Sequence, residues 1–322
     1  MPHTLVAGKS TKARLGRVDG RSPNKLVYYR TRLANSAYRW PMGWEFTADI
    51  ETYAEKVRAL LTRDPVRNTV PLTVLDGLRS GGMGERTSDE PILLAWYDGP
   101  PSGAVLMTPP YELLLAVVPE GGVADLVDAL RTHGAVLPGV NGDVGVVAEF
   151  SAAWLDGTGR RAEVSFRTRL YGLDVLVEPS PPPPGRPRRG IDADADLAMR
   201  WFLAFHDEAG MGRGDVAWTV RDRIADGRIW LWEDEGGEVV SLAARQRPAV
   251  GVARIGPVYT PPEHRRRGFA AAVTATCTRD ALEHADQVVL FTDLANPTSN
   301  SIYQQLGYRP VTDRTVARFV NQ

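Results

Sequence analysis

The sequence predicts an α/β protein in which a mixed sheet carries helices on both faces, with two copies of this arrangement in the chain. Three observations lead to this prediction. Segments with helical periodicity alternate with short apolar segments, the same order of segments occurs twice, and a proline-rich stretch at residues 179–190 separates the two occurrences. With 322 residues, the chain is also long enough for about two domains.

The first half begins with two predicted helices. Apolar residues recur at helical spacing from Ile50 to Leu61, with Thr47 as the expected N-cap, and a second helix is expected at 70–78. Three strands, a helix, a strand, a helix and a last strand follow, at 92–97, 104–107, 112–118, about 123–130, near 140, 143–155 and 161–170.

The second half repeats this order. Two helices are expected at 195–206 and 216–226, and three strands at 228–234, 238–246 and 251–260. A helix at 268–284, a strand at 287–292, a short helix at 298–306 and a strand at 314–320 complete it. The repeated order suggests a duplication, although the two halves share little sequence identity.

The proline-rich stretch contains four consecutive prolines, at 181–184. Consecutive prolines lack backbone donors and favour an extended geometry, so we expect residues 179–190 to form a stiff linker. The predicted domains are then 41–178 and 191–322. Residues 1–40 are rich in positive charge and have no stable apolar period, which predicts a disordered basic tail.

The segment with the clearest chemistry is VYTPPEHRRRGFAAAV, residues 258–273. It reads as the end of a strand, a basic loop and the start of a helix rich in small residues. The first turn of such a helix presents unpaired N–H groups and the positive end of its dipole. Gly268 lets the backbone approach an anion closely, and three arginines precede it. The segment is therefore suited to a diphosphate.

This loop, Arg265-x-x-Gly268-x-Ala270, resembles the acetyl-CoA loop of the GNAT superfamily, whose pattern is Gln or Arg, two residues, Gly, one residue, and Gly or Ala. A second segment, FTDLANPTSNSIYQQLGY at 291–308, resembles the distal motif of that superfamily: an asparagine after the fifth strand, a small helix with a tyrosine, and Leu-Gly-aromatic. The resemblance covers about residues 191–322. It implies the GNAT acyl-CoA N-acyltransferase fold.

The resemblance also implies a reaction, the direct transfer of an acetyl group from acetyl-CoA to a primary amine. The third strand of the second half is expected to splay from its neighbour near Gly256-Pro257, exposing backbone N–H groups to the pantetheine and the acyl carbonyl. Tyr303 is the implied catalytic acid that protonates the leaving thiolate. The implied acetyl-CoA contacts are Val258, Tyr259, Thr260, Arg265, Arg266, Arg267, Gly268, Phe269, Ala270, Asn296, Asn300 and Tyr303.

The general base is not identified by the sequence. Many relatives use a glutamate on the third strand, but residues 252–257 contain none. Glu233, Asp234 and Asp293 remain open as bases acting through water. Cys277 lies inside a predicted helix and is expected to be inert packing. The five histidines lack metal-ligand spacing, so no metal is expected.

In the first half, the resemblance to the GNAT superfamily is limited to the order of helices and strands. Val117–Leu126 occupies the position of the basic loop, where Glu120 would repel a pyrophosphate, so we interpret this half as a degenerate GNAT-like copy. Three alternatives remain open: a mycothiol-synthase-like tandem acetyltransferase, a non-catalytic protein that binds or senses acyl-CoA, and an RNA- or ribosome-associated protein that uses the basic tail.

The composition restricts the partners and the compartment. The formal net charge is −1 and no apolar run reaches the roughly 20 residues of a membrane span, so neither nucleic acid nor a membrane is expected as a partner. A lone cysteine fits a reducing compartment, which indicates the cytoplasm. The expected acceptor is a small-molecule or peptide amine, and a homodimer is left open.

Overall fold

The described residues of the first half form six strands and four helices. A computed structural model describes residues 43–80, 90–100, 102–210 and 215–321, so the predicted tail at 1–40 lies outside the described residues. The elements of the first half are β1 (Trp44–Thr47), α1 (Ile50–Leu61), α2 (Thr69–Ser80), β2 (Leu93–Tyr97), β3 (Gly103–Met107), β4 (Leu113–Val117), α3 (Val123–His133), β5 (Gly139–Asp143), α4 (Val144–Leu155) and β6 (Arg160–Leu173).

The second half has the same order of strands and α-helices. Its elements are β7 (Arg186–Arg189), α5 (Ala195–Glu208), α6 (Val216–Ala225), β8 (Ile229–Glu233), β9 (Val239–Arg245), β10 (Val252–Tyr259), α7 (Phe269–Leu282), β11 (Gln287–Asp293), α8 (Pro297–Gln305) and β12 (Tyr308–Asn321). Two short 3-10 turns, at Asp192–Asp194 and Pro262–His264, add to them. The predicted repeat of element order is confirmed.

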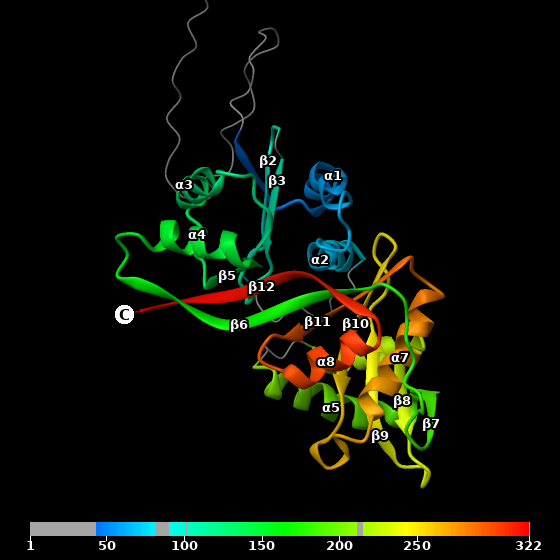
Figure 1. Ribbon diagram of the computed structural model, residues 1–322. Helices are drawn as coiled ribbons and strands as arrows, with labels where there is room; N and C mark the ends of the chain where they lie inside the picture. Colours follow the sequence, from blue (N-terminus) through cyan, green and yellow to red (C-terminus); the bar gives the residue numbers. More distant parts are fainter. Residues whose placement is uncertain (1–42, 81–89, 101, 211–214, 322) are drawn as a thin grey trace, which may run out of the picture. The chain divides into compact units, whose positions relative to one another are not determined.

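The strands form one sheet, with the order β1-β2-β3-β4-β5-β12-β6-β11-β10-β9-β8-β7 (Figure 1). The pairs β4–β5 and β10–β11 are parallel, and the other neighbouring pairs are antiparallel. The predicted mixed sheet is therefore confirmed. Because each half ends in a long strand, the middle of the sheet is formed by β6 and β12 side by side.

These two strands are exchanged between the halves. β6 belongs to the first half but pairs with β11 of the second half, and β12 belongs to the second half but pairs with β5 of the first half. β6 and β12 also pair with each other from Tyr308↔Leu173 to Asn321↔Arg160. Each half therefore completes the sheet of the other.

Helices cover both faces of the sheet, as predicted. In the first half, α1 and α2 cover one face with a buried cluster that includes Tyr53 and Leu72, whereas α3 and α4 cover the other face with a cluster that includes Leu126 and Phe150. In the second half, α5 and α6 bury a cluster around Phe202, and α7 and α8 pack on the opposite face. The apolar strands between them supply most of the core.

One local prediction, the N-cap of the first helix, is wrong, and a short edge strand was not predicted. The N-cap of α1 is Asp49, whose Oδ1 accepts the N–H of Thr52 at 2.6 Å, while the hydroxyl of Thr47 accepts the N–H of Asp49. The expected linker at 179–190 contains a strand, β7. β7 lies at the edge of the sheet, where hydrogen bonds are needed on one side only, so Pro187 is tolerated there.

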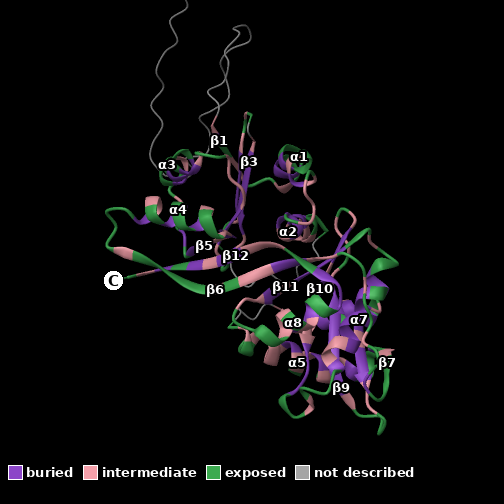
Figure 2. Cartoon of the chain, in the orientation of Figure 1, coloured by how far each residue is buried: buried purple, intermediate pink, exposed green. Residues whose placement is uncertain are grey.

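The segment between β6 and β7 crosses the outer face of α7. Glu178 pairs with Arg279 of α7, and Leu176 packs against the same apolar cluster as the helix. Gly307 has φ +95°, and a Cβ there would lie 1.8 Å from the carbonyl oxygen of Val175, so only glycine lets the segment pass. With the sheet on its other side, α7 is buried along most of its length (Figure 2).

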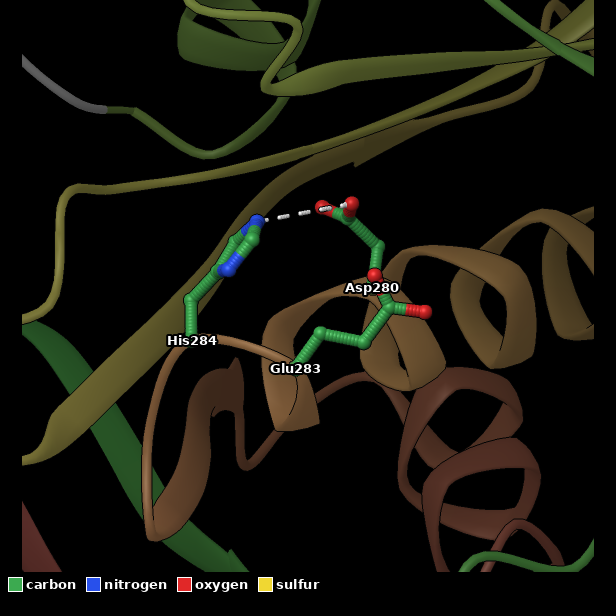
Figure 3. Close-up of side chains that lie close together, drawn as sticks. All are labelled: Asp280, Glu283 and His284. Carbon is green, nitrogen blue, oxygen red and sulfur yellow. Dashed lines mark ion pairs between the residues drawn. The ribbon is translucent and has the colours of Figure 1, made fainter.

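A buried ion-pair cluster ties α7 to the sheet. Asp280 of α7 is 3% exposed, and its two carboxylate oxygens accept hydrogen bonds from Arg245 of β9 and Arg189 of β7, both at 2.6 Å. Burial alone would raise the pKa of the Asp280 carboxyl, but the hydrogen bonds and charges of Arg245 and Arg189 bring it below its usual value. The Nε2 atom of His284 lies 4.0 Å from Asp280 Oδ1 (Figure 3).

Replacing Asp280 by asparagine is expected to lower the free energy of unfolding by roughly 3–5 kcal/mol, because it leaves the buried Arg245 without its carboxylate. Urea unfolding measures this, and Glu283→Gln, an exposed neighbour, serves as the control with a change within about 0.5 kcal/mol. Because the folded pKa is lowered, the contribution of Asp280 is fully present above about pH 4 and is lost as the pH falls through the folded pKa. Equal stability of the two variants would contradict this role.

Candidate functional site

The main feature of the second half is a gap between two parallel strands. β10 and β11 pair only from Val252↔Gln287 to Ile255↔Leu290. Beyond that point β10 pairs with β9 alone, through Val258 and Tyr259, while β11 continues along β6. The expected splay near Gly256-Pro257 is therefore present. In an extended strand, backbone groups of alternate residues point to each side, so part of the 256–260 backbone faces the gap.

The predicted anion loop lies at the end of β10, and its backbone is shaped for an anion. Arg266 has φ +61° and Gly268, the N-cap of α7, has φ +86°. The first hydrogen bond of the helix is donated by Ala272 N–H to the carbonyl of Gly268, at 3.1 Å. The preceding N–H groups lack intrahelical acceptors, the cap has no side chain, and the first turn contains no acid. Such consecutive free N–H groups form an anion-binding concavity.

The three arginines of the loop have different surroundings. Arg265 donates through Nε to the carbonyl of Thr260 at 2.8 Å and through Nη2 to both oxygens of Glu208 at 2.7 and 2.8 Å, which fixes the loop to the strand end. Arg266 and Arg267 are exposed and form no ion pair with any carboxylate in the described ranges. The charge of Arg265 is thus partly neutralised, and Arg266 and Arg267 supply the remaining positive field.

The asparagines of the distal motif hold α8 in place. Asn296 caps α8 by accepting the N–H of Ser299 at 3.0 Å. Asn300 donates to the carbonyl of Asp293 at 2.9 Å and accepts from the hydroxyl of Tyr171 at 3.0 Å. Both groups of the Asn300 amide are therefore engaged within the fold. Contact of Asn296 and Asn300 with acetyl-CoA stays a prediction.

Tyr171 is a site residue that sequence reasoning missed. It belongs to β6 of the first half, is fully buried, and hydrogen-bonds both Asn300 and Gln304 of α8. No motif marks it, because its position beside α8 follows only from the exchange of β6 into the second half. Tyr171 therefore orients the helix that carries Tyr303.

Tyr303 lies in the same apolar cluster as Phe269, which begins α7, and as Val258 of β10. The strand, the loop and the tyrosine that the sequence assigned to one site therefore share one apolar cluster, and the role of Tyr303 at the reacting thioester stays a prediction. Tyr303 is 8% exposed, and burial raises the pKa of its phenol to about 12. The phenol is therefore protonated at neutral pH and able to donate.

The carboxylates considered as general bases are engaged elsewhere. Glu233 accepts hydrogen bonds from Arg186 and Arg188, which hold the pKa of its carboxyl below the usual value. Asp234 accepts the N–H groups of the β8–β9 turn, and Asp293 accepts the N–H of Ala295 at 2.8 Å. The base therefore stays unassigned.

The lone cysteine and the acidic cluster of Figure 3 do not extend the site. Cys277 is fully buried in the α7 core, and burial raises the pKa of its thiol to about 12, so it stays a protonated packing residue. Asp280, Glu283 and His284 have ligand atoms within 4.8 Å of one another. Asp280 is already neutralised by Arg245 and Arg189, whose positive charges oppose a cation.

The corresponding loop of the first half has the opposite character. Its helix α3 begins after Gly122, but Glu120 precedes the helix, Asp125 lies in its first turn, and no arginine is near in the sequence. The field at this helix start is therefore unfavourable for a pyrophosphate.

None of the described helices is long and apolar enough to span a membrane.

Known proteins resemble the chain in two ways. Residues 235–317, less than half of the chain, match the family model described as FR47-like protein. No functionally curated protein matches the sequence. The matched residues contain the β10–β11 gap, the arginine loop, α7 and α8.

Solved structures resemble nearly the whole described region. A Drosophila protein has a TM-score of 0.60 at 14% identity and covers 87% of this chain and 100% of its own. A GCN5-related N-acetyltransferase from Sphaerobacter thermophilus has a TM-score of 0.57 at 15% sequence identity and covers 85% of this chain and 95% of its own. A tandem GNAT protein from the clavulanic acid biosynthesis pathway has a TM-score of 0.52 at 13% sequence identity and covers 86% of this chain and 98% of its own. The chain therefore has the fold of the GNAT acetyltransferases, and residues 235–317 of its second half are similar to the FR47-like family.

Proposed function

We propose that the second half transfers an acetyl group from acetyl-CoA to a primary amine of a small molecule or peptide. The observation that supports this most strongly is the position of an uncapped helix start, with free N–H groups and two unpaired arginines, at the mouth of the β10–β11 gap. A diphosphate fits the helix start, and a thiol-bearing arm of extended shape fits between the strands.

Three parts of the donor, the pyrophosphate, the pantetheine arm and the thioester carbonyl, have candidate partners in this site. The N–H groups of 267–270 and the charges of Arg266 and Arg267 would hold the pyrophosphate. Backbone groups of 256–260 that face the gap would hold the pantetheine amides and the thioester carbonyl, as a strand holds an added strand. An N–H aimed at that carbonyl also stabilises the oxyanion that forms during attack.

The reaction needs little beyond positioning and one proton donor. The amine nitrogen attacks the thioester carbonyl, a C–N bond forms and the C–S bond breaks. The Tyr303 phenol donates a hydrogen bond or its proton to the departing sulfur, and the proton of the amine leaves to solvent through a base that is not assigned. The hydrogen bond from Tyr171 to Asn300 would fix α8, the helix that carries Tyr303.

Turnover of acetyl-CoA with a panel of primary amines tests the proposal, with calorimetry to count bound acetyl-CoA. We expect one site and acetylation of at least one amine class. One site without any turnover would favour an acyl-CoA-sensing protein, and two sites would favour a tandem acetyltransferase of the mycothiol-synthase type. Absence of binding would overturn the proposal.

Gly268→Val is expected to weaken acetyl-CoA binding at least about ten-fold, because a β-branched residue does not tolerate φ +86° and the N–H groups would turn away from the anion. Calorimetry measures the affinity. Gly134→Val is the matched control: Gly134 has φ +77°, ends α3 of the first half, and has open space around it. Both variants carry similar backbone strain, so equal losses of binding would contradict a specific role of the loop.

Tyr303→Phe is expected to lower kcat by roughly 10²-fold and to change the acetyl-CoA affinity less than about two-fold, because it removes one proton donor and keeps the ring. Steady-state kinetics and calorimetry measure the two effects separately. Equal losses in turnover and binding would identify Tyr303 as a packing or binding residue instead.

The pH dependence of kcat gives an independent test of Tyr303. The rate is expected to rise with pH as the amine acceptor loses its proton and to show no decline up to about pH 9.5, because the phenol, with a pKa raised to about 12, stays protonated throughout. A decline between pH 8 and 9.5 in the wild type that is absent in Tyr303→Phe would show that the phenol titrates there and contradict this account.

A further inference from the structure

We propose that the gap between β4 and β5 in the first half is a binding site for a small carboxylate, recognised by the guanidinium of Arg314. β4 and β5 pair only at Leu113↔Val140 and Leu114↔Asn141. Beyond these pairs β4 continues along β3, and β5 continues along β12. The separation leaves a cavity of about 310 Å³. This site is separate from the proposed acetyl-CoA site.

The decisive feature is a buried cation with an unused donor. Arg314 of β12 is 6% exposed and lines the cavity. Its Nη1 lies 3.5 Å from Asp143 Oδ1, and its Nη2 is buried without a hydrogen-bond partner among the described residues. A buried charged donor left without an acceptor is costly, so an acceptor supplied by a ligand would remove a real penalty.

The charges around the cavity favour a single negative charge on the ligand. Three guanidinium groups line it, from Arg63, Arg67 and Arg314, against two carboxylates, from Asp64 and Asp143. Arg67 already lies between the two acids, 3.5 Å from Asp64 and 4.0 Å from Asp143. One positive charge therefore remains, and a monovalent anion balances it.

The rest of the lining favours an organic acid over inorganic phosphate. Leu60, Leu115, Val117 and Val146 supply apolar walls. A carboxylate with a short apolar chain can bring an oxygen to the guanidinium of Arg314, while its chain contacts these walls. A dianionic phosphate would carry more charge than the site balances and would leave the apolar walls without a partner.

Among the residues that the structure describes, the second half has no counterpart of this site, and this distinguishes it from an acyl-CoA site. Asp143 of β5 pairs in register with Arg314, whereas Asp293 of β11 pairs with Thr168 of β6. An arginine therefore lies beside the gap of the first half where the second half has threonine. The loop at Glu120 also has no positive charge to hold a diphosphate. The site therefore suits a small carboxylate that is not attached to CoA.

The test uses the full chain with butanoate as probe and butanamide, its neutral isostere, as comparison. Ligand-observed NMR titration is expected to show butanoate binding at least about ten-fold more tightly than butanamide, because only the anion satisfies Arg314. Arg314→Met is expected to remove this preference. Arg318→Met is the matched control on the same strand, since Arg318 is exposed, pairs with Glu112 and does not line the cavity.

A second variant keeps the test decisive if Arg314→Met fails to fold. Arg67→Gln, at a half-exposed side chain, removes the charge surplus and is expected to weaken butanoate binding several-fold. Equal binding of butanoate and butanamide, an unchanged preference in these variants, or displacement of butanoate by acetyl-CoA would overturn the proposal. None of these results bears on acetyl-CoA binding at the Gly268 loop, which is measured separately.

Discussion

The backbone hydrogen bonds between β6 and β12 hold the two halves in one sheet, and both proposed sites depend on them. Because the last strand of each half lies in the sheet of the other, Tyr171 of the first half reaches α8 of the second, and Arg314 of the second half reaches the gap of the first. Neither half alone would contain a complete sheet or a complete site. The segment that connects β6 to β7 extends this dependence, since it covers α7. The physical unit of function is thus the pair of halves.

Within this common frame, the two halves differ in electrostatics and in the backbone of the loop before the helix, where Gly122 has φ −87° and Gly268 has φ +86°. Each has a parallel strand pair that separates after a few residues, next to a helix start. In the second half the helix start carries two arginines without an ion pair among the described residues, and its first turn contains no acid, which suits a diphosphate. In the first half acids flank the helix start, and the positive charge lies instead at the side of the gap, on Arg314. Duplication of a scaffold followed by a shift of charge would produce two sites for different anions.

The sequence predicted much of this structure because the signals concerned are local. Periodicity marked the helices and strands, Gly256-Pro257 marked the place where β10 leaves β11, and the run before Gly268 marked the anion loop. What escaped prediction depends on contacts between residues far apart in the chain. The exchange of β6 and β12 follows from which edges meet after folding, and no local pattern encodes it. Tyr171 and Arg314 acquire their roles only through that exchange, and β7 forms because an edge position tolerates Pro187.

The most direct test of the central claim is a crystal structure of the full chain with acetyl-CoA. We expect the pyrophosphate on the N–H groups before Ala272, the thioester between β10 and β11 within reach of the Tyr303 hydroxyl, and no nucleotide between β4 and β5. Acetyl-CoA bound in the gap of the first half, or bound in the second half away from the Gly268 loop, would contradict this account.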